Sequence, residues 1–468
     1  MSRLIYSCVF FNESYLDLLN LLLESFSRHD TSKTKYLIIT TSRFQNKIQE
    51  MFDAHNIDGD IWCINSIFTQ FAASCARLQI FSYPEIAKYD TLLYLDADIL
   101  ITNSLDPIFD IELEEKLYSM SLADVTIGDW GNGKDLFAEN DINIDPRTPQ
   151  PIHPCVLLFK NCEQIKCLFF DILTHIKERV PGDYDLKGSF DQDFIIYHCF
   201  MQNCFNNTHL NKFVKENYLE EDETMILNHF CALHQETCAT PFGKQDMMLT
   251  YLSKIGTPGY TRNIIHVGAN IGDCFNELEI ISLFDYVSIN DTCVFVEPIP
   301  YLFKQLEENY NTKYPGNDFT FINKAVSNVI GEAEMTMASE DNDFNEEALH
   351  YYPAMSSIDP NFIANHQAGS DRPDENLITE KITVPTTTLN KIVEEAGMTK
   401  IDLLQIDAEG HDFEIIYAYD FSVIPKKIIF EHCHMKDGNL AILLSNLQGM
   451  GYKQTGFTEL DIVLELSN

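Results

Sequence analysis

The sequence is poor in basic residues and has no long apolar run. Its 32 lysines and arginines face 71 aspartates and glutamates, which gives a formal net charge of -39 at pH 7. A surface with this excess of negative charge repels nucleic acid backbones and anionic lipid surfaces, so we expect no nucleic acid partner. No stretch supplies the roughly 20 consecutive apolar residues of a membrane-spanning helix, so we expect no transmembrane segment.

A secretory signal and a cysteine framework are also missing. The first residues, MSRLIYSCVFFNESY, lack the continuous apolar core of a signal peptide because Asn12 and Glu13 interrupt it. The 13 cysteines are odd in number, lie among apolar residues and never have CxxC spacing. This pattern is typical of reduced thiols in a core rather than of disulfides or a zinc site. We therefore expect a cytoplasmic protein.

What is present is an alternation of strand and helix patterns in two separate parts of the chain. Runs such as LIYSCVF, TKYLIITT and PCVLLFKN alternate with helical runs such as YLDLLNLLLESF, which is typical of an α/β domain. Gly256 and Pro258 punctuate the chain before a second α/β series begins at Ile264. We predict a first domain over residues 1–250, a linker over 251–262 and a second domain over 263–468.

Two aspartates, Asp96 and Asp98, interrupt the apolar stretch YDTLLYLDADILI. Where a strand ends, two carboxylates one residue apart can face the same cleft and bind a hard divalent cation such as Mn²⁺ or Mg²⁺. An ion bound in this way keeps open coordination positions, which phosphate oxygens can occupy. An isolated pair of this kind is more often a solvated strand end, so the interpretation depends on the rest of the chain.

The segment CARLQIFSYPEIAKYDTLLYLDADIL resembles the family of retaining glycosyltransferases that includes glycogenin and the bacterial lipopolysaccharide galactosyltransferases. VFFNESY, HPCVLLFKN, DQDFIIYHCF and ILNHFCA resemble further segments of that family in the same order. The resemblance implies a Rossmann-like GT-A fold for the N-terminal domain. It also implies transfer of a sugar from a nucleotide sugar, such as a UDP-sugar, to a glycan acceptor with retention at the anomeric carbon.

The same resemblance implies roles for single residues. His229 completes a metal site with Asp96 and Asp98, while Asp191 and Gln192 face the transferred sugar and the acceptor. Taken alone, each of these residues is more often a core or surface residue, so their order along the chain is what favours the site. The implied donor-binding residues are Asn12 and Tyr15 at the uracil ring, Arg77, and Asp124 at sugar hydroxyls.

Two differences from the family concern the donor site. The family's Asn-x-Gly is His153-Pro154-Cys155 here, and HFCALHQETCA lacks the Gly and Lys that commonly follow the histidine. The missing Gly and Lys favour an alternative in which the first domain is a degenerate enzyme that only binds a sugar or a partner.

In the second half, NIIHVGANIGD places a strand directly before a glycine-rich turn. Gly268 and Gly272 would let a ligand approach the backbone closely, and Glu297, at the end of the strand CVFVEPIP, suits a ribose diol. Both NAD and S-adenosylmethionine fit these features. EPIPYLFKQLEENY, VPTTTLNKI and IDLLQIDAEGHDFEII resemble the FkbM family of S-adenosylmethionine-dependent O-methyltransferases. The resemblance implies a C-terminal domain with the Rossmann-like class I methyltransferase fold.

The FkbM resemblance also implies the binding residues. Gly268, Asn270 and Gly272 hold the methionine end of S-adenosylmethionine, Asp273 neighbours the turn, and Glu297 holds the ribose.

The IDAEG signature implies the reacting end of the site. Asp407 and Glu409 face the methyl group, although acidic residues are also common at helix N-termini without a catalytic role. Methyl transfer requires alignment of the acceptor oxygen, and a sugar hydroxyl also needs a base. Asp407, His411 and His432 are the candidate bases.

The sequence therefore predicts a bifunctional enzyme that adds a sugar to a glycan and methylates a sugar hydroxyl. An alternative is a methyltransferase that acts on a protein or a small metabolite, with the first domain as its scaffold. The sequence does not indicate which sugar is donated, which hydroxyl is methylated or whether the chain forms oligomers.

Overall fold

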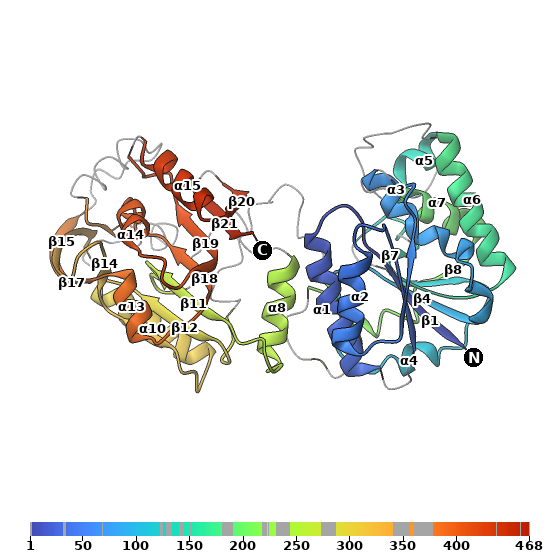
Figure 1. Ribbon diagram of the computed structural model, residues 1–468, viewed down its shortest axis with the longest axis horizontal. Helices are drawn as coiled ribbons and strands as arrows, with labels where there is room; N and C mark the ends of the chain where they lie inside the picture. Colours follow the sequence, from blue (N-terminus) through green and yellow to red (C-terminus); the bar gives the residue numbers. More distant parts are fainter. Residues whose placement is uncertain are drawn as a thin grey trace. The chain divides into compact units, whose positions relative to one another are not determined.

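The computed structural model divides the chain into two compact units, Met1–Cys231 and Ala232–Asn468 (Figure 1). Each unit has its own β-sheets and its own hydrophobic core. The described residues are 2–30, 34–67, 69–121, 125–127, 133–139, 145, 147–149, 151–179, 191–217, 222, 224–230, 244–272, 287–339, 356–359, 378–436, 438–458 and 460–467.

The first unit contains two β-sheets, whose strands are β1 (Arg3–Cys8), β2 (Lys35–Thr40), β3 (Gly59–Cys63), β4 (Thr91–Leu95), β5 (Ile99–Ile101), β6 (Leu117–Met120), β7 (His153–Lys160), β8 (Phe205–Asn206), β9 (Val214–Glu216) and β10 (Leu227–His229). The larger sheet has the order β3-β2-β1-β4-β7-β6-β8, and the smaller one has the order β5-β10-β9. Strands β3, β2, β1 and β4 run parallel, and β7 is antiparallel to β4.

Helices cover both faces of the larger sheet (Figure 1). They are α1 (Ser14–His29), α2 (Gln45–His55), α3 (Gln70–Ser74), α4 (Asp106–Phe109), α5 (Lys134–Glu139), α6 (Glu163–Arg179) and α7 (Gln192–Gln202), with 3₁₀ turns η1 (Cys75–Ser82) and η2 (Ile86–Lys88). On one face, Leu4 and Tyr6 of β1 pack in a core with η1, α6 and α7. On the other face, Tyr36 of β2 lies edge-on to Phe26 of α1, with ring centroids 5.0 Å apart. Coverage on both faces explains why these strands are apolar almost throughout.

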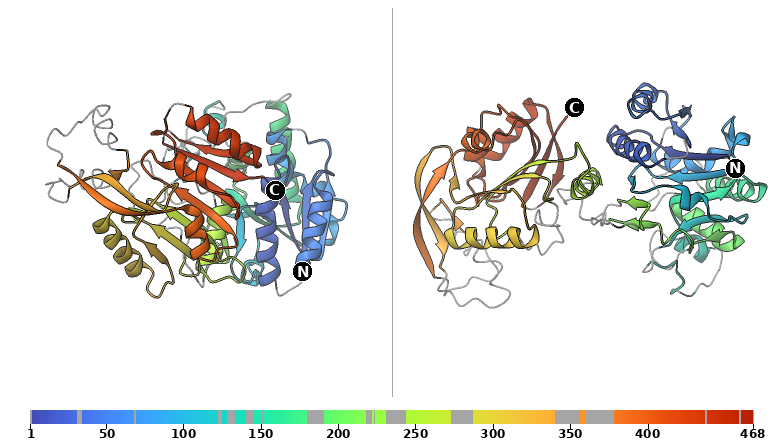
Figure 2. Two further views of the ribbon diagram at one scale, coloured as in Figure 1. Left: turned by 60° about the vertical axis from the view of Figure 1, so that its left-hand side comes forward. Right: turned by 90° about the horizontal axis from the view of Figure 1, so that it is seen from below.

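The second unit also has two sheets, with strands β11 (Asn263–Val267), β12 (Thr292–Val296), β13 (Thr320–Ile322), β14 (Ala325–Val326), β15 (Gly331–Ala338), β16 (Ser356–Ser357), β17 (Thr379–Thr387), β18 (Ile401–Ile406), β19 (Pro425–Glu431), β20 (Tyr452–Phe457) and β21 (Asp461–Leu466). The larger has the order β13-β12-β11-β18-β19-β21-β20, and the strands from β13 to β19 are parallel. The smaller has the order β14-β17-β15-β16 and forms one edge of the unit (Figure 2).

The helices of the second unit are α8 (Lys244–Lys254), α10 (Pro300–Lys313), α13 (Leu389–Glu395), α14 (Asp412–Ala418) and α15 (Asn439–Gly449). On one face of the larger sheet, Ile265 and Val267 of β11 share a core with α13, α14 and α15. On the other face, Phe295 of β12 packs on Tyr310 of α10, with ring centroids 4.1 Å apart. The predicted α/β class is confirmed, and each half has a sheet whose central strands are parallel, with antiparallel strands toward one edge.

The division between the units falls earlier in the chain than the predicted linker at 251–262, because α8 is attached to the second unit. Ser253 of α8 donates a hydrogen bond of 2.7 Å to Asp291. Arg262 donates to Thr250 of α8 at 2.6 Å and also forms an ion pair with Asp291 at 2.6 Å. The glycine and proline residues that suggested a linker therefore form the turn between α8 and β11.

Two expectations from composition can be compared with the described residues. Among these residues, none of the helices combines the length and the apolarity that crossing a membrane requires. The described cysteines are free thiols, and Cys75, Cys155, Cys199, Cys204 and Cys293 are buried. Cys167 and Cys433 are exposed, so the expectation of a core position is wrong for these two.

Candidate active sites

In the first unit, strand pairing brings Asp96, Asp98 and His229 together. Asp96 and Asp98 directly follow β4, and the chain then continues into β5. His229 ends β10, which pairs antiparallel with β5 so that His229 lies opposite Ile99. As a result His229 Nε2 lies 3.6 Å from Asp98 Oδ1. One ligand atom from each of the three residues lies within 4.8 Å of the others.

The donor set of this cluster suits a hard divalent cation. Two carboxylates and one imidazole are ligands that Mn²⁺ and Mg²⁺ accept in proteins. Burial raises the pKa of Asp96, and the Asp98 carboxylate adds to the rise while Arg77 opposes it. The buried Asp98 carboxylate and the half-buried Asp96 carboxylate repel each other, and a cation between them would offset that repulsion. The geometry therefore fits the predicted metal site.

Arg77 connects the aspartate pair to Asp191, which precedes α7. Its Nε and Nη2 donate to the two oxygens of Asp191, both at 2.8 Å. Its Nη1 donates to the Pro154 carbonyl at 2.8 Å and lies 3.4 Å from Asp96 Oδ1. Arg77 and Asp191 are both buried. The predicted donor-binding arginine therefore engages the predicted catalytic aspartate directly, a pairing that the sequence did not indicate.

The remaining predicted residues of the first unit lie at the ends of secondary structure elements. Gln192 is the first residue of α7. Asn12 and Tyr15 lie between β1 and the first turn of α1, and Tyr15 is exposed. Because β1 and β4 are parallel neighbours, this turn and Asp96 lie at the same carboxyl edge of the sheet. Asp124 lies outside the described residues.

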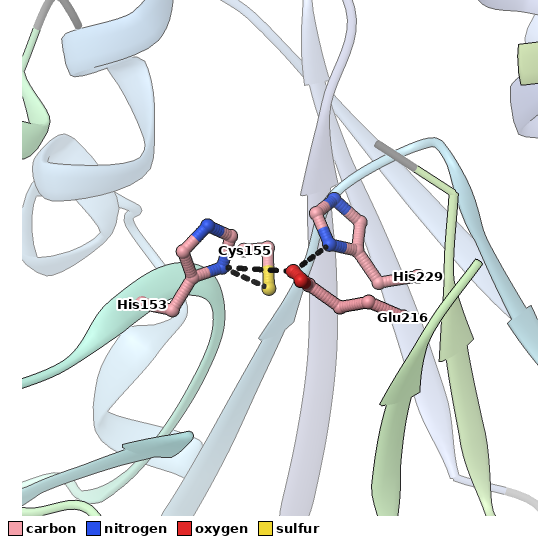
Figure 3. Close-up of side chains that lie close together, drawn as sticks. All are labelled: His153, Cys155, Glu216 and His229. Atoms are coloured by element: carbon pink, nitrogen blue, oxygen red, sulfur yellow. Dashed lines mark hydrogen bonds and ion pairs between the residues drawn. The ribbon is translucent and has the colours of Figure 1, made fainter. Parts of the chain in front are cut away.

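Glu216 was not singled out from the sequence, yet it contacts His229. It ends β9, which pairs in parallel with β10 so that Glu216 is the register partner of His229. Its Oε1 accepts a hydrogen bond of 2.9 Å from His229 Nδ1 (Figure 3). A carboxylate on one imidazole nitrogen orients the other nitrogen toward a metal. No motif marks Glu216, because it ends a short polar strand and meets His229 only through the pairing of β9 with β10.

In the second unit, the glycine turn lies against the end of β18. Gly268 follows β11 with φ +73°, and a Cβ there would lie 1.7 Å from the Asp407 carbonyl oxygen. Gly272 has φ +85°, and a Cβ there would lie 2.5 Å from the Tyr310 ring. Both positions therefore require glycine for close packing within the protein, in addition to any approach of a ligand.

Glu297 follows β12 and is tied to this turn. Its Oε2 accepts from the Asn270 amide at 2.9 Å, and its Oε1 accepts from the Ile299 amide at 2.8 Å. Burial raises the pKa of Glu297 to about 7. The predicted ribose-binding carboxylate is therefore fixed beside the predicted cofactor turn. Asp273, the other acidic residue predicted here, lies outside the described residues.

A cluster of carboxyl groups lies where β18 and β19 end. Oxygens of Asp407, Glu409 and Glu431 lie within 4.8 Å of one another. Desolvation within the cluster, with Asp461 as a second cause, raises the pKa of Asp407 to about 7, although the residue itself is exposed. Burial, followed by the Asp407 charge, raises the pKa of Glu431 to about 9 and that of Glu409 well above its usual value. Groups that titrate near neutral pH suit proton transfer.

Glu431 was not identified from the sequence, although it ends the apolar strand KKIIFE in the way that Glu297 follows CVFV. That likeness is the pattern that could have predicted it.

The two candidate histidines differ in what they contact. His411 Nε2 lies 3.0 Å from Ser327 Oγ, and burial lowers the pKa of His411. His432 stacks on Phe457 and donates from Nε2 to the Thr458 carbonyl at 3.1 Å. Because that carbonyl holds the Nε2 proton, His432 is better explained as a structural residue. Asp407 and His411 remain the candidate bases.

Comparisons with known families match both halves. Residues 266–453 match the methyltransferase FkbM domain, and residues 31–146 match glycosyl transferase family 8. The chain thus contains a methyltransferase domain and a glycosyltransferase domain, and both predicted resemblances are confirmed. Asp96 and Asp98 lie inside the glycosyl transferase family 8 match, whereas Asp191 and His229 lie beyond its end. No curated protein matches the chain.

Three similar solved structures illustrate the range of structural likeness. The bifunctional glycosyltransferase WbbM, apo, is 14% identical with a TM-score of 0.38, and the likeness covers 55% of this chain and 50% of that one. The galactosyltransferase LgtC with donor and acceptor sugar analogs is 18% identical with a TM-score of 0.36, covering 55% and 98%. Apo GlyE of Streptococcus pneumoniae TIGR4 is 14% identical with a TM-score of 0.36, covering 69% and 81%. At TM-scores this low, these likenesses add nothing to the family matches.

Proposed function

We propose that the chain is a bifunctional enzyme of glycan modification. Its first unit would transfer a sugar from a nucleotide sugar, such as a UDP-sugar, with the help of Mn²⁺ or Mg²⁺. Its second unit would methylate a sugar hydroxyl with S-adenosylmethionine. The observation that carries the proposal is the presence of both family matches, over residues 31–146 and 266–453, in one chain.

In the first unit, Asp96, Asp98 and His229 would hold the cation, which when bound would stabilise negative charge on the leaving diphosphate. The exposed Tyr15 ring would stack on the uracil, with Asn12 beside it. Asp191 would stand near the anomeric carbon, where positive charge develops during retaining transfer. Arg77 keeps the Asp191 carboxylate in place through its paired hydrogen bonds.

In the second unit, Gly268, Asn270 and Gly272 would enclose the methionine end of S-adenosylmethionine, and Glu297 would bind its ribose. Asp407 would remove the proton from the acceptor hydroxyl as it aligns with the methyl group. The pKa of Asp407, about 7, supports this role because a base works best when its pKa lies near the working pH.

Replacement of Arg77 by methionine is expected to destabilise the first unit by about 3–5 kcal/mol, because it leaves the buried Asp191 carboxylate without its cation. Both tryptophans, Trp62 and Trp130, belong to the first unit, so their fluorescence during urea unfolding reports on that unit alone. Arg147→Met is the matched control, because Arg147 makes the same kind of paired contact with Asp145 on the surface. The Arg147→Met variant should have the same urea unfolding midpoint as the unaltered chain. Equal midpoints for both variants would contradict the role of the buried pair.

Methyl transfer is expected to accelerate as pH rises through about 7. The pKa of Asp407 is raised to about 7 by desolvation within the carboxyl cluster and by Asp461, so its basic form is scarce at pH 5.5 and predominates above pH 8. The rate under saturating S-adenosylmethionine, measured from pH 5 to 9, should therefore rise through neutral pH, in a curve to which the neighbouring carboxyl groups of Glu409 and Glu431 also contribute. A rate that is constant from pH 5.5 upward would mean that a base with an ordinary carboxyl pKa, or none, limits the reaction.

The alternative of a degenerate first domain rests on the missing Gly and Lys in HFCALHQETCA, the segment that begins at His229. It is tested by hydrolysis of nucleotide sugars in the presence of Mn²⁺. Turnover that depends on Asp98 excludes a domain that only binds.

A further inference from the structure

The first unit contains another cluster of metal-ligating side chains, formed by His153, Cys155, Glu216 and His229 (Figure 3). His153 and Cys155 are two residues apart on β7, so both side chains lie on the same face of that strand. Glu216 and His229 are register partners at the ends of β9 and β10. Three strands from two different sheets thus bring one thiol, two imidazoles and one carboxylate to one place.

The four ligand atoms of the cluster lie within 4.8 Å of one another, which is the spacing range in which one metal ion can be bound. His153 Nδ1 lies 2.9 Å from Cys155 Sγ and 3.7 Å from Glu216 Oε1, and His229 Nδ1 lies 2.9 Å from the same Glu216 oxygen. Ligand atoms at tetrahedral angles, about 2.0–2.3 Å from Zn²⁺, are about 3.3–3.5 Å apart. The two contacts of 2.9 Å would each have to lengthen by about half an ångström to admit the ion.

Burial and chemistry favour a thiophilic ion here. Cys155 and His229 are 2% and 4% exposed, so solvent does not compete strongly for these ligands. Cysteine and histidine ligands select Zn²⁺ over Mg²⁺ and Mn²⁺, which prefer oxygen ligands. We propose that His153, Cys155, Glu216 and His229 form a closed, four-ligand Zn²⁺ site that ties β7 of the larger sheet to β9 and β10 of the smaller one.

The proposed site has a consequence for the neighbouring aspartate pair, and this part rests on the proposed sugar transfer. His229 faces Glu216 with Nδ1 and Asp98 with Nε2. A neutral imidazole that binds Zn²⁺ through Nδ1 carries its proton on Nε2, so it cannot also ligate a cation between Asp96 and Asp98. Zn²⁺ would therefore withdraw one ligand from the Mn²⁺ site and weaken Mn²⁺ binding.

Cobalt titration of the metal-free full-length chain tests the site directly. Co²⁺ takes the place of Zn²⁺ in such sites, and a bound thiolate gives a near-ultraviolet charge-transfer band. We expect this band to saturate at one equivalent and to vanish when Zn²⁺ is added. Cys155→Ser should abolish it. Cys433→Ser is the matched control, because Cys433 lies beside Glu431 and His434 in the second unit, and it should keep the band. No band in the unaltered chain, or loss of the band only in Cys433→Ser, would overturn the proposal.

A second variant covers the case in which Cys155→Ser fails to fold. Glu216→Gln keeps the thiol but replaces the carboxylate ligand, so the band should persist while the Zn²⁺ affinity falls on the order of tenfold or more. Competition with a chromophoric chelator measures that affinity. An unchanged affinity would mean that Glu216 is not a ligand and that the four-ligand site is wrong.

Electron paramagnetic resonance of free Mn²⁺ tests the consequence for the aspartate pair. One equivalent of Zn²⁺ should weaken Mn²⁺ binding on the order of tenfold. Equal Mn²⁺ affinity with and without Zn²⁺ would show that the two ions do not compete for His229. The Zn²⁺ site itself would still be judged by the cobalt titration. Absence of Mn²⁺ binding in Zn²⁺-free protein would count against the proposed sugar transfer alone.

Discussion

Asp98→Asn is expected to abolish the cation-dependent turnover of a nucleotide sugar, with a loss of about 10²-fold or more in kcat/KM. The Asp98 carboxylate is buried beside Asp96 and His229, so water cannot readily take its place as a ligand of the cation. The backbone should keep its place, because the Asp98 carbonyl accepts from the Phe230 amide at 2.9 Å. Asparagine has nearly the same shape, so the loss would reflect charge and cation binding rather than packing.

Asp90→Asn is the control for this prediction. Asp90 precedes the same strand at its amino end, where its carboxylate accepts from the Ser2 amide. The turnover of the Asp90→Asn variant should stay within about twofold of that of the unaltered chain. Release of the nucleoside diphosphate, measured against Mn²⁺ concentration, gives both activity and cation dependence. Full activity of Asp98→Asn with an unchanged Mn²⁺ dependence would contradict the assignment of the metal site.

Asp407→Asn is expected to lower the rate of methyl transfer by about 10²–10⁴-fold while S-adenosylmethionine still binds. The Asp407 amide donates to the Val267 carbonyl at 3.0 Å, which fixes the residue independently of its side chain. Its carboxyl group lies in the acidic cluster with Glu409 and Glu431, where its pKa is about 7. Asparagine cannot accept the proton, so the rate of methyl transfer should fall while the affinity for S-adenosylmethionine should not change.

Asp402→Asn is the matched control, since Asp402 lies at the amino end of the same strand and pairs with Lys426. It should keep the methyl transfer rate within about twofold. Single-turnover rates and calorimetric binding of S-adenosylmethionine separate chemistry from affinity. If Asp407→Asn keeps its rate and His411→Ala loses it, the base is His411 instead.

The sequence predicted the parts of the fold and site that follow from local pattern. Asp96 and Asp98 end an apolar strand, and Glu297 follows another, so their positions at the carboxyl edges of parallel sheets follow from strand direction. His229 could be placed near the aspartates only through the family resemblance, because it lies far along the chain and contacts them through the pairing of β5 and β10.

Other features depend on contacts that no local pattern encodes. The Arg77–Asp191 pair joins residues 114 positions apart. Glu216 reaches the site by the register of two short strands. The absence of CxxC spacing argued against a zinc site, yet His153 and Cys155 meet Glu216 and His229 across strands. Spacing rules describe ligands on one turn or hairpin, so they do not detect a site assembled from several strands.

Mass spectrometry of acceptor glycans treated with the full-length chain tests whether one chain both adds a sugar and methylates it. With a nucleotide sugar, Mn²⁺ and labelled S-adenosylmethionine together, we expect a product that has gained both a sugar and a methyl group. Asp98→Asn should give no added sugar, and Asp407→Asn should give the sugar without the methyl group. The proposed bifunctional activity would be contradicted if the unaltered chain added no sugar to any acceptor. It would also be contradicted if the chain methylated a protein or small metabolite and no glycan.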